Sequence, residues 1–91
     1  LGEMTRRPVI GGNWKMNGSG ELVNNFADYF TVNSGCLAHA TVAIAPPATL
    51  LSLASSLLAP MGIHVAAQNI HPEAKGAYTG ELSTGLIKEA G

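Results

Sequence analysis

The feature that most constrains the fold is an alternation, repeated three times, of a short apolar run with a segment of helical character. The three apolar runs, rich in small and β-branched residues, are residues 8–12, 41–45 and 63–67. The segments with helical signals that follow them are residues 20–32, about 47–60 and 83–91. Strands that alternate with helices predict an α/β fold in which a parallel sheet packs against helices.

Local signals mark the ends of the predicted helices. Ser19 and Ser83 stand where a side-chain hydroxyl caps the first turn of the first and third helices. Pro47 favours the first turn of the second helix. Pro60 and Gly62 then end it, because proline cannot continue a helix and glycine tolerates the left-handed conformation that often follows one.

The chain has 91 residues, which is short for this architecture. Three parallel strands leave two open edges, and open edges are templates for misassociation. We therefore expect these residues to be the first part of a longer chain that forms either an open, doubly wound sheet or a closed (β/α)8 barrel. A barrel needs ~250 residues, so three units are about a third of one. Residues 1–7 are interpreted as a leader or extension ahead of the domain.

Charge and hydropathy argue against two classes of partner. The formal net charge is −1, with neither a basic stripe nor an acidic tail, so no nucleic acid or membrane surface is predicted as a partner. The most apolar stretch, residues 47–60, is interrupted by serines and is shorter than the ~20 residues that a membrane span needs.

Cys36 is the only cysteine, which favours a reducing compartment, and we expect it to be a small buried hydrophobic residue.

The stretch GGNWKMN, residues 11–17, is the strongest candidate for a binding site. Strand alternation places Asn13 and Lys15 on one face at the C-terminal end of the first strand, where parallel α/β folds bind ligands. An ammonium group beside an amide donor suits an anionic substrate or an oxyanion that forms during a reaction. The alternative is a solvated loop lysine beside a turn asparagine. Gly11 and Gly12 predict a tight bend or a close backbone approach.

Other chemical groups give weaker signals. His39, His64 and His71 lack the spacing of a metal site, and His64 is interpreted as a hydrogen-bonded structural residue within the third strand. Neither a dinucleotide-binding fingerprint nor a phosphate-binding P-loop motif occurs. No carboxylate falls clearly at the inward, C-terminal end of a predicted strand, so a general base is not evident.

The segment from Gln68 to Leu82, QNIHPEAKGAYTGEL, is long for a connection between a strand and a helix. Such connections usually have about two to six residues, which indicates that this one has a role of its own. Gly76 and Gly80 bracket an apolar, aromatic tip that contains Tyr78. An exposed tip of this kind predicts an interaction element.

Three motifs, in this order and spacing, resemble the triosephosphate isomerase family. They are GGNWKMN (11–17), AAQN (66–69) and KGAYTGELS (75–83), and the resemblance runs from about Arg7 to Gly91. It implies that residues 8–91 are the N-terminal part of a single (β/α)8 barrel domain and form its first three βα units. It also implies an isomerase that interconverts D-glyceraldehyde 3-phosphate and dihydroxyacetone phosphate through an enediolate, without a cofactor or metal.

The resemblance further implies roles for individual residues. Asn13 and Lys15 match the family's first-strand substrate-binding pair, and Lys15 also stabilises the negative charge that develops on the substrate oxygen. Thr79 matches the loop-tip threonine that lies against the partner's active site in a homodimer formed through the 68–82 loop. The other residues assigned to the dimer interface are Met16, Gly76, Tyr78 and Glu81. The family's place in glycolysis and gluconeogenesis implies a cytoplasmic enzyme, although organellar forms exist.

The 91 residues stop short of two groups that the family uses, a histidine on the fourth strand and a glutamate base further on. We therefore expect this chain to be inactive by itself. Two alternatives to the isomerase stay open. One is another phosphosugar-handling barrel enzyme with different catalytic groups, and the other is a non-catalytic dimerisation or binding module that uses the same loop. A downstream histidine and a barrel-lining glutamate would favour the isomerase over both.

Overall fold

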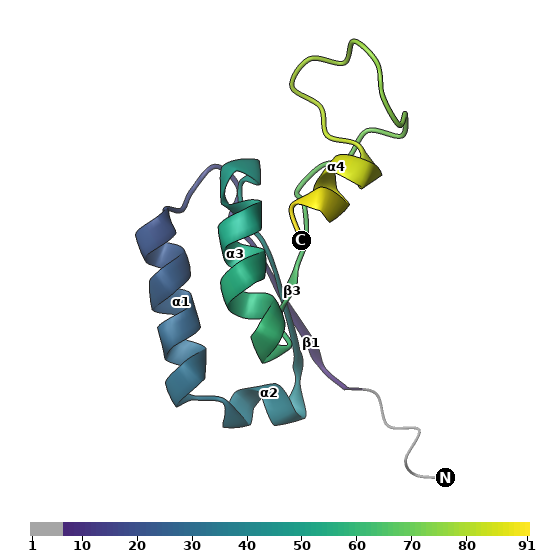
Figure 1. The fold of residues 1–91 in the computed structure, drawn as a ribbon. Coiled ribbons are helices and arrows are strands. Elements are labelled where there is room, and N and C mark those ends of the chain that lie inside the picture. Colours follow the sequence, from purple (N-terminus) through teal and green to yellow (C-terminus); the bar gives the residue numbers. More distant parts are fainter. Residues whose placement is uncertain (1–6) are drawn as a thin grey trace, which may run out of the picture.

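A three-stranded parallel sheet organises the molecule, which is known from a computed structural model that describes residues 7–91 (Figure 1). The strands lie in the order β1 (Val9–Asn13), β2 (Thr41–Ala45) and β3 (His64–Val65). The helices are α1 (Gly20–Val32), α2 (Gly35–His39), α3 (Leu51–Leu58) and α4 (Thr84–Glu89), and the 3-10 turns η2 (Ala48–Leu50) and η3 (Ala59–Met61) flank α3. The predicted parallel α/β fold is confirmed.

One face of the sheet is covered by α1 and α3, which pack side by side (Figure 1). Their apolar positions and those of the strands form a single core of buried side chains. The core residues are Val23, Ala27, Val42, Ile44, Ala54, Leu58 and Ile63. Burying a Leu or Ile side chain contributes about 1.5–3 kcal/mol, so this layer fixes how the two helices lie on the strands.

The predicted helix ends are confirmed by capping contacts. The hydroxyl of Ser19 accepts a hydrogen bond from the Leu22 N–H at 3.1 Å, and that of Ser83 accepts one from the Leu86 N–H at 3.3 Å. Gly62 ends η3 in the left-handed conformation, with φ of 81°. These contacts satisfy backbone groups that a helix end would otherwise leave unpaired.

The third strand is shorter than the predicted 63–67. Ile63 is buried, but its N–H donates to the carbonyl of Leu58 at 3.1 Å, so it belongs to the turn that ends the preceding helix. His64 is exposed in β3, and within residues 7–91 no side-chain hydrogen bond is formed by it. The interpretation of His64 as a hydrogen-bonded structural residue is therefore wrong for this part of the chain.

The short helix α2 was not predicted, and it changes the environment of Cys36. The helix joins α1 to β2, and Cys36 lies exposed on it, so the expectation of a buried cysteine is wrong. Arg7 holds the C-terminal end of α2, since its guanidinium donates to the carbonyl oxygens of Leu37 at 2.9 Å and Ala40 at 3.0 Å. Arg7 thus contacts the folded domain, whereas the rest of the predicted leader lies outside the described residues.

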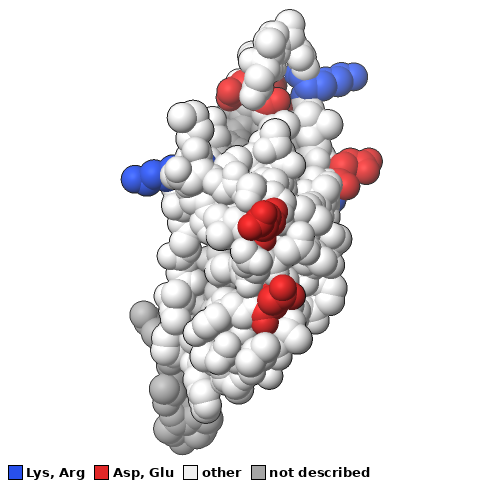
Figure 2. All heavy atoms as spheres, turned by 90° about the vertical axis from the view of Figure 1, so that its left-hand side faces the viewer, with Lys and Arg blue, Asp and Glu red and all other residues white. Residues whose placement is uncertain are grey.

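The β1 edge of the sheet is open. β1 is exposed along its whole length, and a neighbouring strand pairs with only one of its sides. Between β1 and α1 runs an apolar groove of about 300 Å³, lined among others by Ile10, Trp14, Phe26 and Cys36. The surface of the molecule on the side of α1 carries few charged side chains (Figure 2).

In residues 7–91, no helix has the length and apolar character to cross a membrane.

Candidate functional site

The carboxyl ends of the strands meet at one edge of the sheet, from which the loops to the helices leave (Figure 1). At this edge β1 gives way to a tight turn over residues 13–17. The strand ends at Asn13, and Lys15 has a φ of 56°, in the left-handed region. The expectation that strand alternation runs on to Lys15 is therefore wrong, because the chain has already turned. Among residues 7–91, Lys15 is the only non-glycine residue with a positive φ.

Two asparagine side chains build this turn. The Oδ1 atom of Asn13 accepts a hydrogen bond from the backbone N–H of Lys15 at 2.8 Å. Asn17 donates to the carbonyl oxygen of Trp14 twice, from its backbone N–H at 3.2 Å and from Nδ2 at 3.0 Å. Short amide side chains favour such turns because they take the place of a backbone partner. The structure therefore brings Asn13 and Lys15 together, with Asn13 in the role of a turn residue.

A third amide reaches the same turn from a distant part of the chain. The Nε2 atom of Gln68 donates to the carbonyl oxygen of Lys15 at 2.8 Å and to that of Ala45, the last residue of β2, also at 2.8 Å. The Ala45 carbonyl accepts the N–H of Trp14 as well, at 3.0 Å. Gln68 thus ties together the turn after β1, the end of β2 and the segment after β3. Sequence analysis did not assign Gln68 to the site, although its position just after the third strand places it at the same edge.

The two glycines of the motif play a different part from the predicted one. Gly11 and Gly12 lie within β1, which does not bend there. A Cβ atom at Gly12 would meet nothing within 4 Å, and one at Gly11 would lie 4.0 Å from the carbonyl of Ala43. They line a shallow hollow of about 310 Å³ that extends to Asn13. The absence of side chains therefore keeps this part of the sheet open.

A tight approach of the kind predicted for Gly11 and Gly12 occurs at Gly18, the residue that follows the motif. Its φ is 120°, and a Cβ atom there would lie 2.8 Å from Cε3 of Trp14. Real Cβ atoms essentially never come so close to another heavy atom. Only glycine therefore fits between the Trp14 ring and the start of α1 without a shift of the backbone or the ring.

The loop over residues 68–82 projects away from the sheet and contains no helix or strand (Figure 1). Gly76 and Gly80, which bracket its tip, have φ angles of 145° and 84°. The five residues assigned by resemblance to a dimer interface are all exposed: Met16, Gly76, Tyr78, Thr79 and Glu81. Met16 is 95% exposed and Tyr78 is 47% exposed. These residues are accessible on the surface of the chain.

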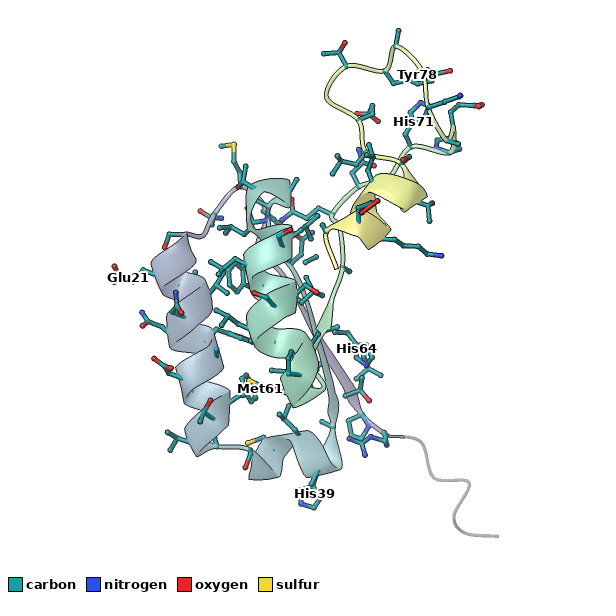
Figure 3. The ribbon with its side chains drawn as sticks, in the orientation of Figure 1. Glu21, His39, Met61, His64, His71 and Tyr78 are labelled. Atoms are coloured by element: carbon teal, nitrogen blue, oxygen red, sulfur yellow. The ribbon has the colours of Figure 1, made fainter. Side chains whose placement is uncertain are left out.

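The three histidines lie in separate parts of the molecule (Figure 3). His39 ends α2, His64 is in β3 and His71 is in the 68–82 loop. Across residues 7–91, no group of three metal-ligating side chains comes together.

Comparisons with known proteins agree on one family. Residues 8–91 match the sequence model described as "Triosephosphate isomerase". Triosephosphate isomerase of Halorhodospira halophila is 43% identical over 86 residues, which are 94% of this chain and 33% of that protein. The enzyme of Taenia solium is 43% identical over 88 residues, which are 97% of this chain and 34% of that protein.

A solved structure shows the same relation in three dimensions. The crystal structure of triosephosphate isomerase from Bartonella henselae superposes with a TM-score of 0.78 and 41% sequence identity, over 94% of this chain and 34% of that one. The chain thus spans about a third of the length of the relatives it matches. Its three strands, each followed by a helix, are the first three βα units of a (β/α)8 barrel. The chain belongs to the triosephosphate isomerase family.

Proposed function

We propose that the protein containing these residues interconverts D-glyceraldehyde 3-phosphate and dihydroxyacetone phosphate through an enediolate. The observation that carries the proposal is the match of residues 8–91 to the family, together with a lysine held at the carboxyl edge of the sheet. In parallel α/β folds this edge is where substrates bind. The proposed substrate is a phosphorylated triose, which carries the anionic group that an ammonium attracts.

In this proposal Lys15 and Asn13 form the substrate-binding pair. Lys15 binds the anionic substrate and stabilises the negative charge that develops on its oxygen in the enediolate. The Oδ1 atom of Asn13 is engaged by the Lys15 N–H at 2.8 Å, so its contribution to a ligand comes from the Nδ2 donors. In the described part of the chain both residues are exposed to solvent, which leaves their polar groups accessible to a ligand.

Isomerisation also needs a general base to move a proton and a group that polarises the carbonyl. We assign these groups to the two thirds of the family's length that this chain does not match. Residues 8–91 are then the N-terminal part of a single barrel domain, with residues 1–7 ahead of it. On this proposal the 91 residues alone bind no substrate productively and do not catalyse the reaction.

We propose that the protein is a homodimer that pairs through the 68–82 loop. The support for this is the exposed loop tip, with Tyr78 and Thr79 at its end and an exposed Met16 in the turn after β1. Exposed apolar and aromatic side chains of this kind favour a protein partner. We also propose a cytoplasmic location, for which the support is membership of a family whose enzymes act in glycolysis.

The test is to express the full-length protein and to assay isomerisation in both directions, with the Lys15→Ala variant as the matched control. Turnover that depends on Lys15 supports the proposal. Absence of turnover above that variant contradicts it. The exposed loop favours one second candidate, a non-catalytic dimerisation module, which predicts a dimer in sedimentation together with no turnover of this or any related phosphosugar.

A further inference from the structure

The backbone of Lys15 is held from both sides by side chains of other residues. Its N–H donates to Oδ1 of Asn13 at 2.8 Å, and its carbonyl accepts from Nε2 of Gln68 at 2.8 Å. The two contacts differ in origin. Asn13 is a neighbour in the turn, whereas Gln68 lies 53 positions later in the chain. The peptide groups on either side of Lys15 are therefore fixed relative to the sheet.

This fixation matters because Lys15 is in a conformation that it would not adopt freely. A non-glycine residue in the left-handed region, here with φ of 56°, costs of order 1–2 kcal/mol. Such a conformation persists only where the surroundings over-determine it. If the contact from Gln68 is lost, the peptide after Lys15 can rotate, and the direction of the Cα–Cβ bond changes with it.

Gln68 also sets where the turn lies. Its single amide nitrogen donates to the carbonyl oxygens of both Lys15 and Ala45. The position of the turn after β1 is therefore fixed relative to the end of β2. The Ala45 carbonyl keeps a second donor, the N–H of Trp14 at 3.0 Å. Within the described residues, the Lys15 carbonyl receives a hydrogen bond from Gln68 alone.

We infer that Gln68 is a positioning residue for Lys15: by bridging the turn after β1 to the end of β2, it directs the lysine ammonium toward the reacting oxygen. The inference rests on the proposed function for its consequence in catalysis. It assigns to Gln68 no contact with the substrate. Misplacing a catalytic group by about 1 Å can cost up to about 10²-fold in rate, so the contact is expected to affect turnover.

The test uses the full-length protein with Gln68→Met, which keeps the length of the side chain and removes its donors. A double-mutant cycle with Lys15→Ala separates positioning from general damage, because alanine at position 15 keeps the carbonyl that Gln68 contacts. The matched control is Asn33→Ala. It removes another hydrogen bond from a side-chain amide, the one that Nδ2 of Asn33 donates to the Tyr29 carbonyl at 2.8 Å, at the opposite end of α1.

We expect Gln68→Met to lower kcat/KM roughly tenfold or more when Lys15 is present and to have no further effect when it is alanine. The control should leave kcat/KM unchanged. An equal loss in both backgrounds would mean that Gln68 acts on the structure in general, and the inference would be overturned. No loss in either background would overturn it as well.

A second readout does not depend on the reaction. Hydrogen exchange of the Lys15 amide proton, followed by NMR, should become at least several-fold faster in Gln68→Met, because the turn that protects it loosens. If the wild-type protein shows no isomerase turnover, the proposed function fails. This exchange measurement then still decides the inference, and an unchanged exchange rate would overturn it.

Discussion

The imidazole ring of His71 lies against the phenol ring of Tyr78, with ring centroids 4.0 Å apart and planes inclined by 31° (Figure 3). The two residues come from opposite arms of the 68–82 loop. Two further contacts of His71 shape the loop, one within its first arm and one between the two arms. Nδ1 of His71 accepts the Glu73 N–H at 3.1 Å, and the His71 N–H donates to the Leu82 carbonyl at 2.8 Å. The loop is therefore shaped by its own residues.

Replacing Tyr78 with alanine should loosen the loop without unfolding the domain. Aromatic pairs contribute about 0.5–1.5 kcal/mol, which corresponds to roughly 2–10-fold in the population of the open loop. Tryptic cleavage after Lys75, two residues before the tip, should accelerate by a similar factor in the full-length protein. Tyr78→Phe keeps the ring and is the control. Equal cleavage rates for the alanine and phenylalanine variants would show that the ring contact does not hold the loop.

Thr79→Arg should weaken the proposed homodimer. Thr79 is exposed at the loop tip, and a charged, longer side chain there would be desolvated on contact with a partner. We expect the dimer dissociation constant to rise roughly tenfold or more, measured by analytical ultracentrifugation. Asn25→Arg, at an exposed position on α1, adds the same charge away from the loop and should leave the constant unchanged. An unaltered dimer in Thr79→Arg would count against the loop as the interface.

Lys15→Ala in the full-length protein should collapse turnover. Loss of one group that stabilises a developing oxyanion costs about 10²–10³-fold in kcat, and a neutral side chain cannot replace the ammonium. Lys88→Ala removes an exposed lysine from the last turn of α4 and should have kinetics close to wild type. Near-wild-type turnover in Lys15→Ala would refute the catalytic role of the lysine.

The left-handed conformation of Lys15 predicts a second effect at the same position. Lys15→Gly should be as inactive as Lys15→Ala but more stable than it by about 1 kcal/mol, because glycine adopts φ of 56° without strain. Urea unfolding of the two variants measures this difference. Equal stabilities would mean that the strain at this position is negligible.

Gly18→Ala should destabilise the protein and disturb the indole of Trp14. A Cβ atom at position 18 would lie 2.8 Å from the Trp14 ring, at a φ of 120° that costs a non-glycine residue about 1–3 kcal/mol. Gly35→Ala is the matched control, since a Cβ atom there meets nothing within 4 Å and alanine favours the helix. The free energy of unfolding should fall only for Gly18→Ala, and a similar fall in both variants would contradict the packing argument.

Much of the fold was determined by local sequence signals. The alternation of strands and helices, the capping serines Ser19 and Ser83 and the helix stop at Gly62 were all predicted from neighbouring residues, and the structure confirms them. Such features depend on interactions within a few positions, where side-chain chemistry and backbone preference act together. The family motifs were recognisable for the same reason, since they are continuous stretches of sequence.

The candidate site depended on tertiary structure. Strand alternation predicted that Lys15 lies on the same face of the strand as Asn13. In the structure the strand ends at Asn13, whose side chain accepts the Lys15 N–H, and the chain turns at Lys15. Gln68 meets that turn only because β1, β2 and β3 align their carboxyl ends in one parallel sheet. Cys36 likewise is exposed because it lies on helix α2, which the sequence did not predict. The sequence by itself determined the helices, the strands and the caps at their ends. The tertiary structure decided how the residues of the site face one another, because a contact such as that of Gln68 with Lys15, 53 positions apart, is encoded by no local preference.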